Sequence, residues 1–230
     1  MNLPDSKQRI AQLKHLQAWE THSARLLGGW LPAIRLWEAK HEVGLHLWQD
    51  LETSREIRTR LWELRVNRPD TAAVTAGVLP AIQILASAQY DFELIAGIYL
   101  GVKQALAQAY RDYLAKTHAT WDAPSIDILT RAASRKESQI EWAEAYLQQV
   151  AYKETDQHLV QRWTTFTREL IAATGSVTGE NPSIALPTPP PGYSSRLPFG
   201  EAKRDSRFKI QLQGFERPPV EDTDAHTLWQ

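Results

Sequence analysis

The feature that most constrains this chain is an uninterrupted stretch from Ala33 to Val66 in a sequence of 230 residues. The stretch contains no proline and a single glycine, and its apolar residues recur at helical spacing. It predicts one helix of roughly nine turns. Because such a helix must bury its apolar stripe against other helices, the stretch points to an all-α protein built as a helical bundle.

Further segments carry the same apolar periodicity and complete the predicted bundle. We expect these helices over residues 6–27, 71–89, 91–117, 123–150 and 155–173. The pair Gly28 and Gly29 should end the first of them. Pro80 should kink or split the alanine-rich segment over 71–89, because proline lacks a backbone N–H and clashes with the preceding turn.

The composition changes after residue 175, and residues 176–230 hold eight of the thirteen prolines. Aromatic residues nevertheless recur in this part, beginning with Tyr193, and Phe208, Ile210 and Leu212 alternate like a short strand. We therefore expect a helical bundle domain over 1–175 and an extended, proline-rich arm over 176–230. Whether the arm packs on its own bundle, packs on a second subunit or stays free is left open.

Charge and composition exclude several classes of function. The formal net charge of -1 offers no basic excess for binding nucleic acid. No apolar window is long enough for a membrane span, and the N-terminal residues lack an apolar signal core. Together with the absence of cysteine, this predicts a cytoplasmic protein. A small apolar ligand between the helices, near the alanine-rich segment, is not excluded.

Nine tryptophans are scattered along the chain, and we interpret them as large apolar side chains at helix contacts. Trp37 and Trp48 fall on a secondary apolar patch of the long helix, beside His41. The sequence leaves a homodimer open, formed either through this patch or through the arm.

A group of polar residues lies on the core side of the long helix. On a helical wheel of about 100° per residue, His46 and Asp50 fall in or beside the core stripe, and Glu42 falls at its edge. A carboxylate in a core stripe needs a partner, because desolvation of an unpaired charge costs several kcal/mol. We expect Asp50 to meet His46 one turn away, or an arginine or tyrosine from a facing helix.

This cluster of His46, Asp50 and Glu42 has three interpretations. The first is a structural hydrogen-bonded cluster that sets the helix register. The second is a metal site, with His46, Asp50 and Glu137 as the candidate ligands and iron or manganese as the metal. The third is a role in proton transfer or ligand contact.

The order of the helices resembles the ferritin-like superfamily, and the segment APSIDILTRAASRKESQIEWAE is similar to the last bundle helix of uncharacterised bacterial members. The resemblance implies four bundle helices over 8–27, 33–66, 91–117 and 123–151, with a crossover over 71–89. It also implies a dinuclear metal site, with one glutamate from each of two helices and Glu-x-x-His from each of the other two.

The ligand pattern of that family is incomplete in this chain. Glu20 stands at a suitable height on the first helix, but Glu38 and His41 face away from Asp50 on the wheel. The last bundle helix reads Lys136-x-x-Gln139 where Glu-x-x-His is required, and the third supplies Tyr99 and Lys103 in place of a mid-helix glutamate. The residues at or near these ligand positions are Glu20, Glu38, His41, Tyr99, Lys103, Lys136 and Gln139.

The sequence therefore predicts a ferritin-like helical protein with degenerate metal-ligand motifs. We expect it to be non-catalytic or to bind a partner, with no cofactor. The alternative is a metal-dependent oxidoreductase with an atypical mononuclear or dinuclear site between bundle helices.

Overall fold

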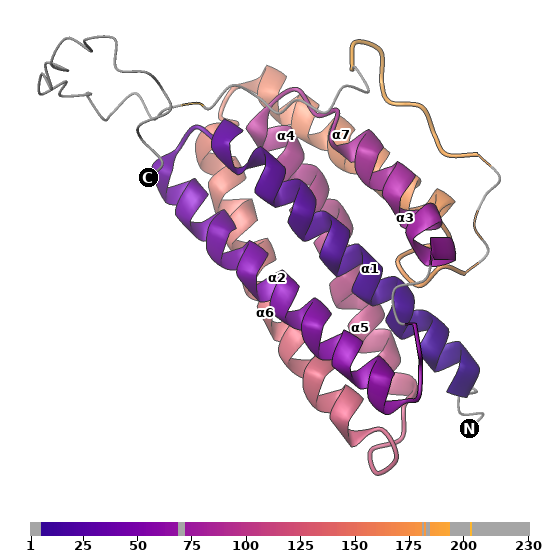
Figure 1. Cartoon of the computed structure of the whole chain (residues 1–230). Coiled ribbons are helices and arrows are strands. Elements are labelled where there is room, and N and C mark those ends of the chain that lie inside the picture. The colour runs from indigo at the N-terminus through magenta and orange to yellow at the C-terminus, as the bar shows by residue number, and fades with distance from the viewer. Residues whose placement is uncertain (1–5, 69–71, 181, 183–184, 194–202, 204–230) are drawn as a thin grey trace, which may run out of the picture.

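The structure, a computed structural model, describes residues 6–68, 72–180, 182, 185–193 and 203, and this part of the chain is all-helical, with no strand (Figure 1). The α-helices are α1 (Ser6–Trp30), α2 (Trp37–Glu63), α3 (Ala72–Leu85), α4 (Asp91–Ile95), α5 (Gln104–Lys116), α6 (Ala123–Val150) and α7 (Glu154–Ala173). A 3-10 turn, η1 (Leu31–Ala33), precedes α2, and a π-helical segment, η2 (Ala96–Lys103), joins α4 to α5.

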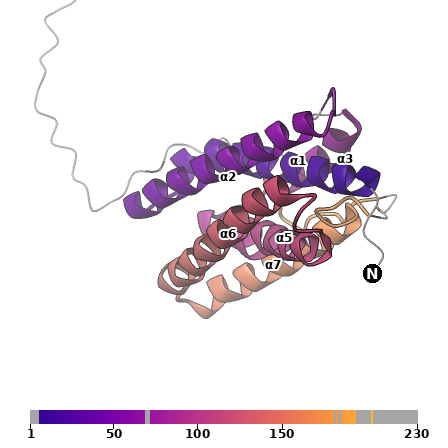
Figure 2. The same ribbon diagram turned by 90° about the horizontal axis from the view of Figure 1, so that it is seen from below.

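The helices form two layers (Figure 2). One layer contains α2, α1 and α3 side by side, and the other contains α6, then α5 with η2, then α7. Contacts between α2 and α6, between α1 and η2, and between α3 and α7 join the two layers. The core lies between them and contains the buried indoles of Trp19, Trp30 and Trp163.

Several helix boundaries differ from those expected. The first helix continues through the two glycines to Trp30, whose side chain is buried. The long helix begins at Trp37 instead of near Ala33, because the 3-10 turn that contains Pro32 precedes it. Helix α3 stays continuous through Pro80, which is exposed, because its other side packs Val78, Ala81, Ile82 and Leu85 into the core.

The π-helical segment η2 was not anticipated from the sequence. It lies inside one continuous helical run from Asp91 to Lys116. Two of its residues, Gly97 and Gly101, pack so closely on α7 that a Cβ on either would lie less than 3 Å from a side chain, that of Trp163 or Thr167 respectively. Because π-turns are rare and are often found at functional sites, the segment draws attention to its own inward side chains.

The tryptophans do not all serve as core side chains. Trp37, Trp48 and Trp62 lie on the outer side of α2 and are more than half exposed, and Trp121 in the loop before α6 is 81% exposed. The interpretation of tryptophans as helix-contact residues is therefore wrong for these four. Indoles on an outer helix face expose a large apolar surface to water.

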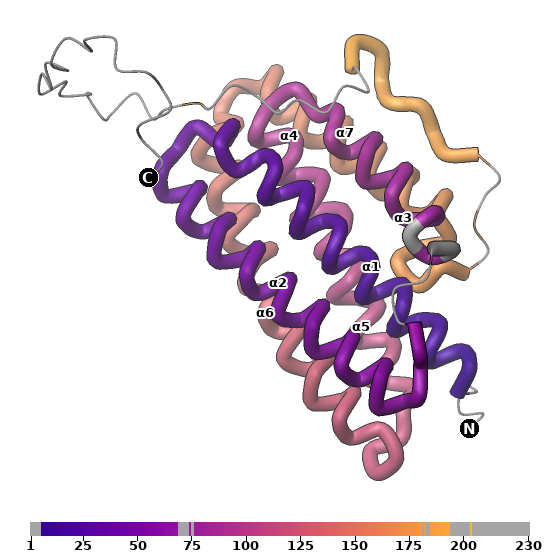
Figure 3. Tube along the Cα trace, viewed as in Figure 1, coloured from indigo at the N-terminus to yellow at the C-terminus, as the bar shows by residue number. Residues whose placement is uncertain are grey.

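Part of the proline-rich region packs on the helices. The stretch 185–193 is drawn in orange on the α3 side of the array in Figure 3. Its Tyr193 ring stacks on Trp163 at 4.7 Å between centroids, and its hydroxyl donates to Glu93. Glu93 also accepts the backbone N–H groups of Gln89 and Tyr90, so it caps the start of α4. The predicted strand-like alternation over Phe208, Ile210 and Leu212 lies outside the described residues.

No helix in the described ranges is both long enough and apolar enough to cross a membrane.

Candidate functional site

The centre of the helical array holds four charged side chains from four different helical segments. They are Glu20 of α1, Asp50 of α2, Lys103 at the end of η2 and Lys136 of α6, and each is at most 1% exposed. We call this group the central network. Its two carboxylates balance its two ammonium groups, which matters because an uncompensated buried charge costs several kcal/mol.

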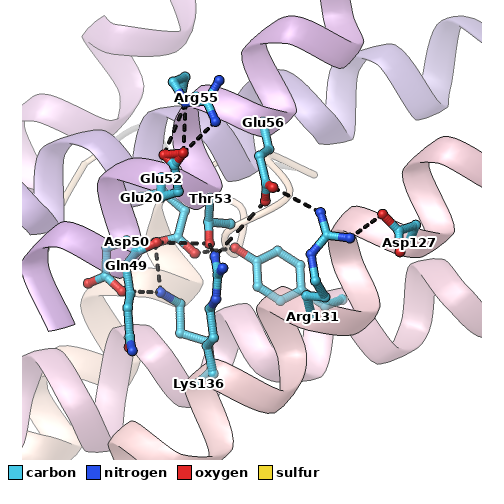
Figure 4. Close-up of polar contacts among 12 residues, drawn as sticks. Glu20, Gln49, Asp50, Glu52, Thr53, Arg55, Glu56, Asp127, Arg131 and Lys136 are labelled. Atoms are coloured by element: carbon cyan, nitrogen blue, oxygen red, sulfur yellow. Dashed lines mark hydrogen bonds and ion pairs between the residues drawn. The ribbon is translucent and has the colours of Figure 1, made fainter. Parts of the chain in front are cut away.

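Lys136 links the two carboxylates (Figure 4). Its Nζ donates to Glu20 Oε2 at 2.7 Å and to Asp50 Oδ1 at 2.6 Å. The Nζ of Lys103 lies 2.8 Å from the other oxygen of Asp50 and forms an ion pair with it. Asp50 is therefore held between two ammonium groups.

Neutral side chains complete the central network at its edges. The hydroxyl of Tyr110 donates to Glu20 Oε1. Lys103 donates to Gln139 Oε1 at 2.8 Å, and Gln139 Nε2 in turn donates to Gln49 Oε1 at 2.8 Å. The Lys103 ammonium also lies 4.2 Å from the centre of the Tyr99 ring, a cation–π distance. These contacts satisfy polar groups that have no access to water.

Helical spacing explains why these residues meet. Lys136 and Gln139 are one turn apart on α6, so both face inward. Glu137, one residue further along than Lys136, is turned by about 100°. It lies on the surface, where its half-exposed carboxylate pairs with Arg111 at 2.8 Å. The structure therefore does not bring Glu137 together with Asp50, and the inward residue at this height of α6 is a lysine.

Burial and charge pairing act on the pKa values in opposite directions. Burial raises the pKa of Glu20 above its usual range. Burial would also raise the pKa of Asp50, but the two lysines outweigh it and hold the pKa below the usual range. Burial opposes the charged form of Lys136, yet Asp50 and Glu20 raise its pKa. For Lys103, burial dominates and lowers the pKa to about 8.

His46 lies next to the central network but bonds elsewhere. Its Nδ1 is 2.9 Å from the Tyr99 hydroxyl, and its ring meets the Trp142 indole edge-on at 5.1 Å. Its Nε2 is 4.0 Å from Glu42, whose side chain is 40% exposed. Burial, followed by the positive charge of Lys103, lowers the pKa of His46 to about 4. The histidine is therefore neutral at pH 7.

The partner expected for Asp50 is corrected by this geometry. Asp50 pairs with Lys103 and Lys136, and not with His46, an arginine or a tyrosine. The sequence expectation misses this pairing because it considers Lys103 and Lys136 only at positions where a metal ligand would stand. Their positions opposite Glu20 and Asp50, with equal numbers of positive and negative groups, are the sequence signal that could have revealed the pairing.

The side chains around the central network do not fit an iron or manganese site. The described part of the chain contains no group of three or more histidine, aspartate or glutamate side chains placed to hold a metal ion. A lysine ammonium has no lone pair to donate, and the amide of Gln139 is a poor ligand for iron. A cation between Glu20 and Asp50 would have to displace the ammonium of Lys136, which already bonds both carboxylates.

Acid should weaken the fold through His46. Its pKa is about 6.5 in the unfolded chain and about 4 in the folded protein, so the unfolded state binds the additional proton in this interval. The contribution of the neutral His46 side chain to the free energy of unfolding is therefore fully present above pH 6.5, and it is lost as the pH falls towards 4. The loss amounts to up to about 3 kcal/mol of unfolding free energy.

Urea denaturation of the wild type and of His46→Gln at several pH values measures this contribution. The glutamine keeps a polar group near Tyr99 but takes up no proton, so the variant should lose less stability between pH 7 and pH 4. Equal pH slopes in the two proteins would show that His46 is accessible to protons in the folded state.

Comparisons of the chain with family models, with curated proteins and with solved structures found no match.

Proposed function

We propose that this chain is a non-catalytic, partner-binding helical protein, and that the central network is a structural element of its core. The observation that supports this proposal best is the position of the Lys136 ammonium between Glu20 and Asp50. Each of these groups uses its charge to satisfy another, and all are shielded from solvent. A catalytic group needs access to a substrate, which this arrangement does not provide.

In this proposal, helices α1, α2 and α6 and the run from α4 to α5 form a ferritin-like four-helix core. Lys103 and Lys136 then take the place of residues that would bind metal in a relative with a working site. With the two lysines in place of metal ligands, the centre still contains charged groups that pair with defined partners. This pairing sets the relative heights of the four helices without a metal ion. The exposed tryptophans of α2 support the partner-binding half of the proposal, because exposed indoles are enriched at interfaces.

Metal analysis tests the non-catalytic half of the proposal. Protein grown with iron and manganese and purified without chelators should contain less than about a tenth of an equivalent of either metal. Asp50→Ala should lower the melting temperature without changing that content, because it leaves Glu20 as the only carboxylate for the two buried ammonium groups and deprives Lys103 of its ion-pair partner. His46→Ala serves as the control for a histidine-dependent site.

Two results would contradict this proposal. Near-stoichiometric metal that is lost in His46→Ala or Asp50→Ala would replace this proposal with the metal-dependent oxidoreductase. An unchanged melting temperature in Asp50→Ala would show that the central network does not stabilise the core.

A further inference from the structure

The outer side of α2 carries a regular line of residues, all of them exposed except the half-buried Gly44. Helix α2 lies at the edge of its layer (Figure 2). Its buried side, with Val43, Ile57 and Leu61, contributes to the contacts with α1 and α6, and the outer side is opposite to it on the helix. The line recurs at alternating steps of four and three residues along the helix, which is the spacing of a coiled-coil seam. We call it the outer seam, and its members are Trp37, His41, Gly44, Trp48, Leu51, Arg55, Arg58 and Trp62.

We infer that the outer seam binds a second copy of this chain, with the two α2 helices antiparallel around a two-fold axis. This inference rests on the proposed function, because it names the partner. An isologous interface requires a surface that is complementary to itself. The outer seam meets this requirement because its spacing is the same when read from either end.

Antiparallel pairing places unlike side chains opposite one another. With the two-fold axis midway between Trp48 and Leu51, each of these two residues faces the other in the second copy. Gly44 then faces Arg55, so the smallest residue of the seam receives one of the longest. The two outer layers pair Trp37 with Trp62 and His41 with Arg58.

Charge decides between this arrangement and a parallel one. In a parallel pair, each residue would face its own equivalent, so Arg55 and Arg58 would each meet an identical arginine. Like charges placed directly opposite each other are destabilising. The parallel pair would also set Gly44 against Gly44 and leave a gap in the seam. The antiparallel pair avoids both defects.

Within the described part of the chain, no contact or backbone angle requires a glycine at position 44. A Cβ built on Gly44 meets nothing within 4 Å, and its backbone does not have a positive φ. Glycine inside a helix is less favourable than alanine, so its presence here is explained by close approach of another side chain. At the end of the seam, the guanidinium of Arg58 already lies 5.1 Å from the centre of the Trp62 ring and extends the flat surface that Trp37 of the second copy would cover.

The area of the outer seam suits a stable dimer. Trp37, Trp48 and Trp62 are 59%, 58% and 52% exposed. Since a tryptophan carries up to about 250 Å² of surface, the three indoles together present about 400 Å². Leu51 and the stems of Arg55 and Arg58, with neighbouring Leu45 at the edge, bring the strip towards the roughly 800 Å² per partner of a standard interface.

Sedimentation velocity on the full chain tests the dimer. The wild type should form a dimer at micromolar concentration, and Trp48→Glu should raise the dissociation constant at least 10-fold, as expected for a central aromatic anchor. The matched control is Trp121→Glu, which makes the same exchange at an exposed position outside the seam and should leave the dimer intact. A wild type that stays monomeric up to about 100 μM overturns the inference. The occupant of the outer seam would then be residues 204–230 of the same chain or a different partner. A dimer that Trp48→Glu leaves unchanged also overturns it.

Disulfide trapping tests the relative orientation of the two α2 helices. Because the chain has no cysteine, the introduced residues are the only ones that can form a disulfide. The variants His41→Cys and Arg58→Cys are purified separately, mixed and oxidised. The antiparallel seam predicts disulfides between the two unlike variants, because identical positions at 41 or at 58 would lie about 26 Å apart along the helices. Disulfides between like variants would overturn the antiparallel arrangement. Failure of the proposed function is recorded separately, by the metal content, so the two failures are distinguishable.

Discussion

Replacing Lys136 with methionine is expected to lower the free energy of unfolding by about 3–5 kcal/mol. Methionine keeps most of the side-chain volume but removes the ammonium that bonds Glu20 and Asp50. The two buried carboxylates are then left with Lys103 alone. Removing one partner of a buried ion pair costs far more than the pair contributes, because the remaining charge stays desolvated.

The pH dependence of the Lys136→Met variant should identify the stranded group. Burial already raises the pKa of Glu20, and loss of the lysine raises it further. A carboxyl whose pKa is higher in the folded state binds more protons there, so the variant should regain stability relative to the wild type as the pH falls below neutrality. A double variant that adds Glu20→Gln should recover part of the loss at pH 7.

Urea denaturation followed by far-UV circular dichroism measures these values. The control is Arg111→Met, which breaks the half-exposed pair with Glu137 and should change the unfolding free energy by no more than about 1 kcal/mol. If Lys136→Met behaves like this control, the centre of the array is hydrated and the central network contributes little to stability.

Truncating Trp163 to alanine is expected to cost about 3–5 kcal/mol. The indole is fully buried, stacks on Tyr193 at 4.7 Å and packs against Phe166 at 5.3 Å. It also lies directly on the backbone of η2 at Gly97. Alanine would leave a large cavity between η2 and α7, and it would remove the surface on which Tyr193 packs.

Thermal and urea denaturation of Trp163→Ala should be compared with Trp121→Ala. The second variant deletes the same side chain from a position that is 81% exposed, so its effect should stay within about 0.5 kcal/mol. Limited proteolysis near Tyr193 gives a second readout, because cleavage there should be faster only in Trp163→Ala. Equal stabilities of the two variants would contradict the burial of Trp163.

Sequence periodicity was sufficient to predict where the helices lie in the chain, though not where each one ends, and to separate the buried side of α2 from its exposed side. The apolar residues at helical spacing indicated which faces would be buried, and Val43, Ile57 and Leu61 are fully buried. The wheel also separated His46 and Asp50, which are buried, from His41, which is exposed. Such a wheel succeeds because an α-helix advances by a constant angle per residue.

The same reasoning could not anticipate the π-helical segment. In η2 the backbone leaves the α-helical repeat over Ala96–Lys103, so a wheel of constant angle does not describe it. The close approach of Gly97 and Gly101 to α7 depends on side chains more than sixty residues away in the sequence. Helix propensities depend only on residues that are close in the sequence, so they contain no information about such contacts.

The sequence by itself determined that this protein is helical, which side of α2 turns inward, and that a metal site of the ferritin-like pattern lacks ligands. Only the tertiary structure decided what occupies the centre instead. Lys103 and Lys136 are poor ligands when each is considered alone, but they become the partners of Asp50 and Glu20 once the helices meet. The physical reason is that a buried charge is favourable only in its pairing, and the pairing partner is set by the packing of distant helices.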